Sequence, residues 1–298
     1  MIQQRKSTCM VLGAGFLWGL IALFVHQLSD SGMGSLPIVC YRNVLAAALL
    51  GGFLAVRSPK LLRIRLCDIW IFLGTGIVSI ALFNYCYFVT LQHASVAVAA
   101  LLLYTSPVFV MLLARVLFAE RITRRKLFAL VLTVFGCACV TGVFSETQTI
   151  PLPFVLTGLG SGLFYGLYSI FGKKALERYE TETVTFYTFA VAAAATLPFS
   201  VQNCAAVLQA HPSVLLAGIG LALFCTVLPF ELYTNGLSGI PASRAAIFAT
   251  MEPLVGTVAG ILAFGDPFSL WTALGVVFVL TAIVLMNLPE HSLPKRHG

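Results

Sequence analysis

The chain has 298 residues, of which 59% are hydrophobic and only 10% are charged, and its mean hydropathy is +0.96. A soluble domain carries about a quarter charged residues, so this composition excludes an ordinary soluble protein and indicates a chain that crosses a membrane several times. The net charge of +7 could suit a nucleic-acid partner. The basic residues are spread over separate loops, however, and we expect no nucleic-acid binding.

Ten apolar segments of about 20 residues follow one another along the chain, each long enough to cross roughly 30 Å of hydrocarbon. Short connections containing Ser, Gly, Asp or Pro separate them. This pattern predicts an all-α integral membrane protein with ten transmembrane helices. The predicted helices are residues 7–29, 36–56, 69–91, 96–119, 127–144, 153–176, 183–201, 214–237, 242–263 and 270–288.

The basic residues predict the orientation of these helices, because they fall at the ends and loops of one side only. They lie at Arg5 and Lys6, in residues 57–65, 121–126 and 173–178, and at Lys295 and Arg296. The loops of the other side, at residues 29–35, 92–95, 145–152, 202–213 and 264–269, contain no Lys or Arg. By the positive-inside rule both termini are cytoplasmic. We expect a multi-pass protein of the bacterial inner (plasma) membrane.

The two halves of the chain resemble each other. Residues 12–20 (LGAGFLWGL) match residues 159–167 (LGSGLFYGL) at an offset of 147, and Pro107 matches Pro253 at an offset of 146. Each half contains five helices, and because five is odd the second half must enter the membrane from the opposite side. An inverted repeat of this kind is a common plan of secondary transporters with alternating access. The predicted halves are residues 7–144 and 153–288.

Short motifs recur in both halves and carry a resemblance to a known family. They are Leu12, Gly15, Trp18 and Gly19 with an echo at Tyr165-Gly166, Tyr104-Thr105-Ser106-Pro107 running to Glu120, and Met251-Glu252-Pro253 running to Asp266. On these motifs the whole chain resembles EamA-type members of the drug/metabolite transporter superfamily. The resemblance implies a central cavity lined by helices 1, 3, 4, 6, 8 and 9, with helices 5 and 10 at the periphery.

The resemblance also implies a range of substrates, and this sequence departs from the family pattern at one position. Family members move amino acids, nucleobase-like compounds, choline-like amines, riboflavin and other small metabolites, often outward. The second copy of the repeat ends in Asp266-Pro267, where the family usually has Gly-Glu. The shorter acid puts a gating role at this position in doubt.

Glu252 is a carboxylate in the middle of an apolar run, where an ionisable group costs about 3 kcal/mol to insert. It shares a helix face with Phe248, Ala249 and Gly256, so only small groups surround the acid on one side. We expect it to face a cavity, where it would pair with a cationic substrate or take up a proton. The alternative is a structural carboxylate held by a hydroxyl or basic side chain of a neighbouring helix.

Two further ionisable residues lie inside predicted helices. Glu231 starts a polar face that continues through Thr234, Asn235 and Ser238, which suits either a substrate or proton path or a hydrogen-bonded seam between helices. Arg42 could bind the carboxylate of an amino-acid-like substrate. We favour a structural role for Arg42, as a helix cap or an ion-pair partner, because the resemblance does not place the second helix among those lining the cavity.

Aromatic side chains at mid-depth suggest a cavity, because Tyr and Trp normally gather at the membrane interfaces. An aromatic wall can hold a cation on its ring faces or stack a planar ring. Packing seams between helices are the alternative, since Gly and Ala flank these residues. The candidates are Trp18, Tyr104, Tyr165 and Tyr168, with Tyr85 and Asn84 as weaker ones.

Pro107 and Pro253 occupy matching positions of the repeat, and we interpret them as pivots for helix rocking, although proline is also common in membrane helices without such a role. No HExxH, P-loop, GxSxG or metal-spaced Cys/His motif occurs, so we expect no enzyme activity, no cofactor and no bound metal.

The sequence therefore predicts a secondary transporter for a small metabolite, driven by substrate gradients or by a coupled proton or ion. An amine-bearing or quaternary ammonium substrate that meets Glu252 is the first hypothesis. Export of amino acids, including aromatic ones, is the second, and a membrane enzyme acting on lipid is a remote third. A lipid bilayer and a small-molecule substrate are the expected partners, and we expect a monomer.

Overall fold

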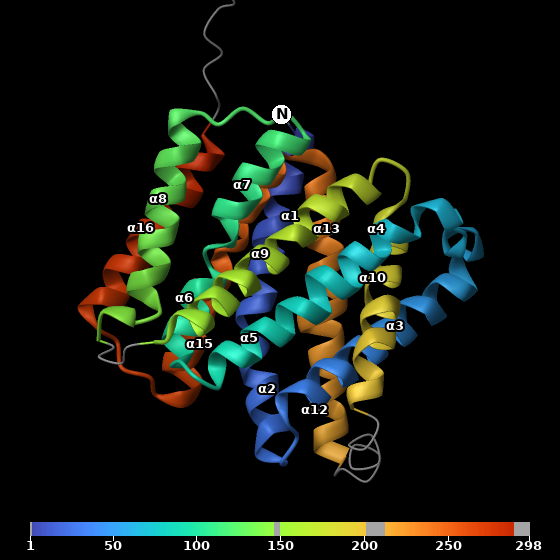
Figure 1. The fold of residues 1–298 in the computed structure, drawn as a ribbon, viewed down its shortest axis with the longest axis horizontal. Coiled ribbons are helices and arrows are strands. Elements are labelled where there is room, and N and C mark those ends of the chain that lie inside the picture. Colours follow the sequence, from blue (N-terminus) through green and yellow to red (C-terminus); the bar gives the residue numbers. More distant parts are fainter. Residues whose placement is uncertain (1, 146–149, 201–211, 289–298) are drawn as a thin grey trace, which may run out of the picture.

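The computed structural model describes residues 2–145, 150–200 and 212–288, and these residues form helices and connections without a strand (Figure 1). The first half contains α1 (Ile2–Gly19), α2 (Ile21–Asp30), α3 (Ser35–Arg57), η1 (Pro59–Leu62), η2 (Leu66–Asp68), α4 (Ile69–Leu73), η3 (Gly74–Leu82), α5 (Phe83–Leu91), α6 (Val96–Leu103), α7 (Ser106–Leu117), α8 (Arg124–Val140) and η4 (Val143–Ser145). The second half contains α9 (Leu152–Ala175), α10 (Thr181–Thr196), η5 (Leu197–Phe199), α12 (Pro212–Ala222), η6 (Leu223–Val227), α13 (Leu228–Gly239), α14 (Ala242–Ala249), α15 (Met251–Phe264) and α16 (Leu270–Asn287).

Among the described residues, eight helical segments are long and apolar enough to cross a membrane. They are Ile2–Asp30, Ser35–Arg57, Leu66–Leu91, Val96–Leu117, Leu152–Ala175, Val214–Gly239, Ala242–Phe264 and Leu270–Asn287. The two other predicted spans coincide with α8, of 17 residues, and α10, of 16 residues. Both are shorter than the 18 residues that define a candidate span. The chain is thus an all-helical, multi-pass membrane protein, and the number ten stays a prediction.

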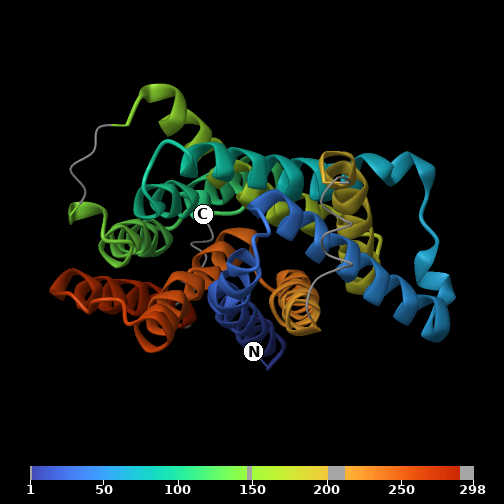
Figure 2. The same ribbon diagram turned by 90° about the horizontal axis from the view of Figure 1, so that it is seen from below.

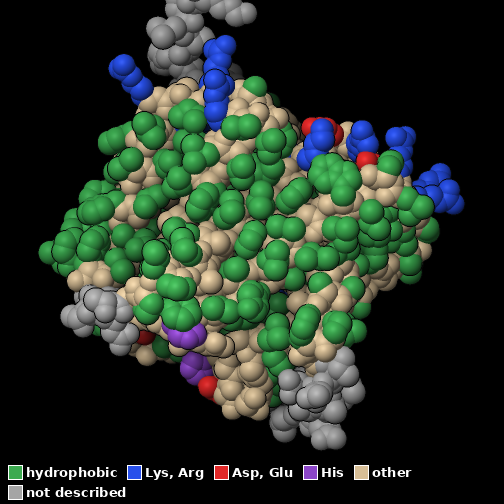
Figure 3. Space-filling view, in the orientation of Figure 1, with side chains coloured by type: hydrophobic (Ala, Val, Ile, Leu, Met, Phe, Trp, Pro, Cys, Tyr) green, Lys and Arg blue, Asp and Glu red, His purple; other side chains and the backbone are tan. Residues whose placement is uncertain are grey.

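Basic side chains gather at one end of the bundle. Figure 3 shows the Lys and Arg side chains of the visible face at the upper end, where the N-terminus lies in Figure 1, and the histidines at the opposite end. We call the end with the N-terminus the basic end. Lys295 and Arg296, which also belong to the predicted basic side, lie outside the described residues. The arrangement fits the predicted orientation, which stays a prediction because no membrane defines the two sides.

Helix irregularities occur at equivalent places in the two halves. The helix pair α6 and α7 is interrupted after Leu103, and the pair α14 and α15 is interrupted at Thr250, while α6 and α14 begin 146 residues apart, at Val96 and Ala242. Wider π-helical turns form η3 and η6, and η6 falls within residues 220–228, which correspond to η3 at the same offset. The predicted repeat leads us to expect such correspondences, and it stays a prediction.

The halves interlock instead of forming two separate bodies. Helix α1 packs against α13 and α15, and its counterpart α9 packs against α5 and α7. Helices α3 and α10 pack together, as do α8 and α16, which form an outer pair at the left of Figures 1 and 2. Each of these pairs joins the first half to the second. In Figure 1, α1 descends from the basic end while α9 rises toward it, as an inverted repeat requires.

Two glycines of α1 let this helix approach the interruption between α14 and α15. Pro253 lacks an N–H group, so the carbonyl of Ala249 loses its helical partner. A Cβ atom on Gly15 would lie 3.0 Å from this carbonyl oxygen, and one on Gly19 would lie 2.8 Å from the carbonyl oxygen of Glu252. Only glycine fits at such a short distance, so these glycines set the position of Glu252 relative to α1.

The second copy of the glycine motif, on α9, approaches the interruption between α6 and α7 in the same way. Pro107 frees the carbonyl of Leu103, and a Cβ atom on Gly162 would lie 3.1 Å from that oxygen. A Cβ atom on Gly166 would lie 3.2 Å from the carbonyl oxygen of Ser106. The duplicated glycine motif is therefore explained by its close contact with a helix interruption of the neighbouring span, once in each half.

The variant Gly19→Ala should therefore lower stability. Its methyl group would meet the backbone of Glu252 and the side chain of Val255 at 2.8 Å and 2.5 Å, and such overpacking costs about 1–3 kcal/mol. The matched control is Gly13→Ala, also on α1, where the added atom meets Leu232 at 3.6 Å, an ordinary contact. Thermal unfolding of the purified proteins in detergent measures both, and equal midpoints for the two variants would contradict the close-contact interpretation.

Candidate functional site

A cavity of about 430 Å³ lies in the centre of the bundle. Its size is within the range of roughly 300–1,000 Å³ that is typical of small-molecule sites. Residues from α1, α2, α3, η3, α5, α6, α7, α9, α13, α14 and α15 line it, whereas α8 and α16 contribute none. The position of α8 and α16 agrees with the predicted peripheral helices. The lining also includes Ser35, Ile38, Val39 and Arg42 of α3, the second predicted span, which the family resemblance does not lead us to expect.

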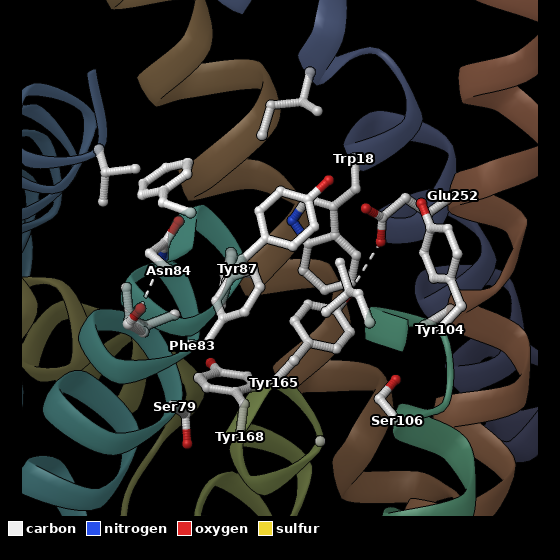
Figure 4. Close-up of a pocket in the computed structure, with 18 of the residues that line it drawn as sticks. Trp18, Ser79, Phe83, Asn84, Tyr87, Tyr104, Ser106, Tyr165, Tyr168 and Glu252 are labelled. Carbon is white, nitrogen blue, oxygen red and sulfur yellow. Dashed lines mark hydrogen bonds between the residues drawn. The ribbon is translucent and has the colours of Figure 1, made fainter. Parts of the chain in front are cut away.

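Glu252 lies on the cavity wall in the first turn of α15, directly after the helix interruption. The hydroxyl of Tyr165 donates a hydrogen bond of 3.0 Å to its Oε2 atom, as the dashed line in Figure 4 shows. No Lys, Arg or His among the described residues forms an ion pair with it. The carboxyl group thus has the hydroxyl partner that the structural alternative predicts, but no neutralising cation, and it remains accessible from the cavity.

The predicted aromatic residues Trp18, Tyr104, Tyr165 and Tyr168 all line the same cavity (Figure 4). Trp18 and Tyr165, which the repeat pairs, come from α1 and α9 and meet edge to face with their ring centroids 6.4 Å apart. Trp18 also contacts the ring of Phe230 at 5.1 Å. Tyr168 contacts Phe230 at 5.0 Å, so the rings of Trp18, Tyr165, Tyr168 and Phe230 form an aromatic wall. Tyr104 lies separately beside Glu252 (Figure 4).

The cavity is closed toward the basic end. Tyr168 and Thr234 share a hydrogen bond of 2.7 Å, and Ser169 and Tyr233 share one of 2.6 Å, so α9 and α13 are tied together. Nearer the basic end, the Lys173 ammonium donates to the carbonyl of Ile240 at 2.7 Å. These contacts join helices beneath the aromatic wall, where the lining residues Ser169, Tyr233 and Ala246 are buried.

At the opposite end the lining reaches the surface. It includes Ser35, the first residue of α3, Leu91, the last of α5, and Val96, the first of α6. Val96 is 70% exposed. The cavity therefore extends to the end without basic loops.

The structure corrects the prediction for Tyr85. This side chain is 64% exposed on the outer surface of α5 and does not line the cavity. Asn84 does line it, and its Nδ2 atom donates to the carbonyl of Ile80 at 2.8 Å. Successive residues of a helix point about 100° apart, so Asn84 and Tyr85 cannot face the same way. The residue that faces the cavity with Asn84 is Tyr87, three positions later.

Several residues that line the cavity were not predicted from the sequence. Tyr87 and Phe83 lie on α5, and Phe230 and Tyr233 lie on α13. The spacing of Asn84, Tyr87 and Phe88 was a usable signal, because residues three and four apart share a helix face. No comparable signal separates Phe230 from the many phenylalanines that face lipid.

Glu231 lies on α13 outside the cavity lining, and its Oε1 atom is buried without a hydrogen-bond partner. The predicted polar face of α13 divides in the structure: Thr234 is buried in the contact with Tyr168, whereas Asn235 and Ser238 are exposed. Thr234 thus belongs to a seam between helices. Pro107 and Pro253 each lie in the first turn after a helix interruption, where a hinge would be placed.

A bundle of apolar helices around a cavity with one carboxylate and an aromatic wall defines a membrane transport protein. Among the described residues, no group of three or more His, Cys, Asp or Glu side chains could hold a metal ion. The chain belongs to the EamA-like transporter family, whose sequence model matches residues 5–142 and 152–288. The protein is thus a transporter and not an enzyme, as the sequence predicts.

Relatives of this chain carry transporter names. An uncharacterized transporter of Archaeoglobus fulgidus is 28% identical over 287 residues, which cover 95% of this chain and 96% of the relative. The threonine/homoserine exporter RhtA of Escherichia coli is 26% identical over 258 residues, 83% of each chain. A solved crystal structure at 17% identity matches with a TM-score of 0.80 over 95% of this chain and 96% of that one, and so shares the fold.

Proposed function

We propose that the protein is a secondary transporter that works by alternating access in the cytoplasmic membrane of a bacterium. In this proposal two inverted five-helix halves, residues 7–144 and 153–288, make ten membrane spans with both termini in the cytoplasm. Two observations support it: the helix interruptions match between the halves, and α1 packs against the second half as its counterpart α9 packs against the first. An inverted repeat can adopt two related conformations that open to opposite sides. The halves would rock about Pro107 and Pro253. We propose a monomer.

The substrate we propose is an amine-bearing metabolite, and the observation that carries this proposal is Glu252. This carboxylate is the one acidic group on the described cavity wall, and it has a single hydrogen bond and no cationic partner. The rings of Trp18 and Tyr104 beside it offer electron-rich faces to an ammonium group. Substrate gradients, or a proton or ion that exchanges with the amine at Glu252, would drive transport.

Export of amino acids is a second candidate. The relative RhtA is named a threonine/homoserine exporter, and it matches this chain over most of its length. The aromatic wall would also accommodate an amino acid with an apolar or aromatic side chain.

A thermal-shift screen of the purified full-length protein tests the amine proposal, because a ligand stabilises the state that it binds. Amines, amino acids, monocarboxylates and uncharged planar heterocycles are the four groups of probes. We expect amine-bearing compounds to raise the unfolding midpoint and monocarboxylates to leave it unchanged. The variant Tyr85→Phe, changed on the lipid-facing surface, should respond like the wild type. Stabilisation by heterocycles or monocarboxylates alone would overturn the proposal.

A further inference from the structure

Arg42 is a buried cation on the wall of the proposed substrate cavity. Its side chain is 8% exposed, and it lines the cavity from α3. Its Nε atom has no hydrogen-bond partner, and none of the ion pairs among the described residues includes it. Asp30, one of the acids that could have paired with it, instead contacts His26 at 2.8 Å. The structural role expected from the sequence therefore has no contact to support it.

An unpaired buried charge in a membrane protein needs a reason, because burial without compensation destabilises the fold. Glu252 interacts electrostatically with Arg42, but the two do not form an ion pair. They are also the one acidic and the one basic residue on the described cavity wall. The cavity thus presents two opposite charges that do not neutralise each other by direct contact.

The two charges lie at different depths. Arg42 is seven residues into α3, which starts at the open end, so it lies about 10 Å along this helix from its start. Glu252 is twelve residues before the end of α15, which finishes at the same side, so it lies about 18 Å along that helix from its end. A molecule with charges of both signs would enter with its cationic group first and leave its anionic group nearer the mouth.

We propose that Arg42 is the anion-binding pole of the cavity and that the substrate is a zwitterion that carries both an ammonium and a carboxylate group. The ammonium group meets Glu252 and the aromatic wall, and the carboxylate meets the guanidinium of Arg42, whose fork of N–H donors matches a carboxylate in two parallel hydrogen bonds. This inference rests on the proposed function and narrows it. A quaternary ammonium ion or a plain amine would leave Arg42 unpaired and would be repelled by it.

Binding of matched probes to the purified full-length protein tests the inference. Phenylalanine, 2-phenylethylamine and 3-phenylpropionate share one ring and differ in charge; leucine, 3-methylbutylamine and 4-methylpentanoate form a second set. In isothermal titration calorimetry we expect the zwitterion of at least one set to bind about tenfold or more tightly than its amine and its acid. Equal affinity of amine and zwitterion in the wild type would overturn the inference without any variant.

The variant Arg42→Gln separates the role of Arg42 from that of the rest of the site. It should weaken binding of the zwitterion about tenfold or more and leave binding of the amine equal or tighter. Arg57→Gln, at the exposed end of the same helix, is the matched control and should bind like the wild type. Loss of both affinities in a folded Arg42→Gln protein would overturn the inference. If no amine-bearing probe of either set binds, the proposed function fails as well.

Discussion

Replacing Glu252 by glutamine is expected to reduce amine-bearing substrate uptake in proteoliposomes about 10- to 150-fold. The substitution keeps the shape of the side chain and its ability to accept a hydrogen bond from Tyr165, but removes the negative charge. Since no other acidic residue lines the described cavity wall, nothing would replace it opposite a cationic group. A charged hydrogen bond of this kind contributes about 1.5–3 kcal/mol, so binding and transport should fall together.

The controls for this experiment distinguish charge from packing. Tyr165→Phe removes the hydroxyl that orients the carboxylate and should have a smaller effect, about tenfold. Glu177→Gln changes an exposed acid that pairs locally with Lys174 and should transport at the wild-type rate. If the Glu252→Gln protein is folded and its flux is unchanged, the carboxylate has no part in the mechanism.

The second large effect is expected at Glu120, whose side chain binds the start of α14 at the closed end of the cavity. Its carboxylate accepts a hydrogen bond of 2.7 Å from the backbone N–H of Ala242 and one of 3.3 Å from that of Ser243, at the start of α14. Lys126 lies 3.5 Å from the same carboxylate and donates to the Ser243 hydroxyl at 2.9 Å. We call this group of residues the Glu120 latch. It links the first half to a helix of the second half.

The described residues of the opposite end form no equivalent group of contacts. Asp266 corresponds to Glu120 at the offset of 146, but it is exposed, and no hydrogen bond or ion pair of its side chain occurs among the described residues. The first turn of α6 is capped by Ser95, whose hydroxyl accepts from the N–H of Val98 at 3.3 Å. The difference matches the closed state of one end and the open state of the other.

Replacing Glu120 by alanine should therefore open the basic end more often. The loss of a helix cap and of a partly buried ion pair costs about 2 kcal/mol, which shifts the balance between closed and open states roughly 30-fold. Hydrogen–deuterium exchange of the purified protein should show faster exchange in the first turn of α14. Glu177→Ala, which removes an exposed local pair, should not change that exchange. Unaltered protection of α14 in the Glu120→Ala protein would show that the latch does not hold this end closed.

The class of the protein and its helical plan follow from the amino-acid sequence. The low share of charged residues requires a membrane, and the periodic apolar segments give helices, because backbone groups in lipid must be satisfied within each segment. The duplicated glycines and prolines, from Gly15 to Pro253, identify the family and the equivalent helix interruptions. Glu252 could be found from the sequence because an acid in the middle of an apolar run is costly wherever it points.

Which side chains line the cavity together depends on how the helices pack against one another. Tyr87 and Tyr85 have the same chemistry, and lipid and an aromatic cavity both accept them, so composition alone does not tell which one faces inward. The inference about Arg42 also depends on the fold, because it rests on Arg42 forming no ion pair among the described residues. Contacts between segments that are distant in the sequence cannot be read from local sequence patterns. The Glu120 latch likewise joins residues 122 positions apart, where only the packing of the two halves brings acid and helix end together.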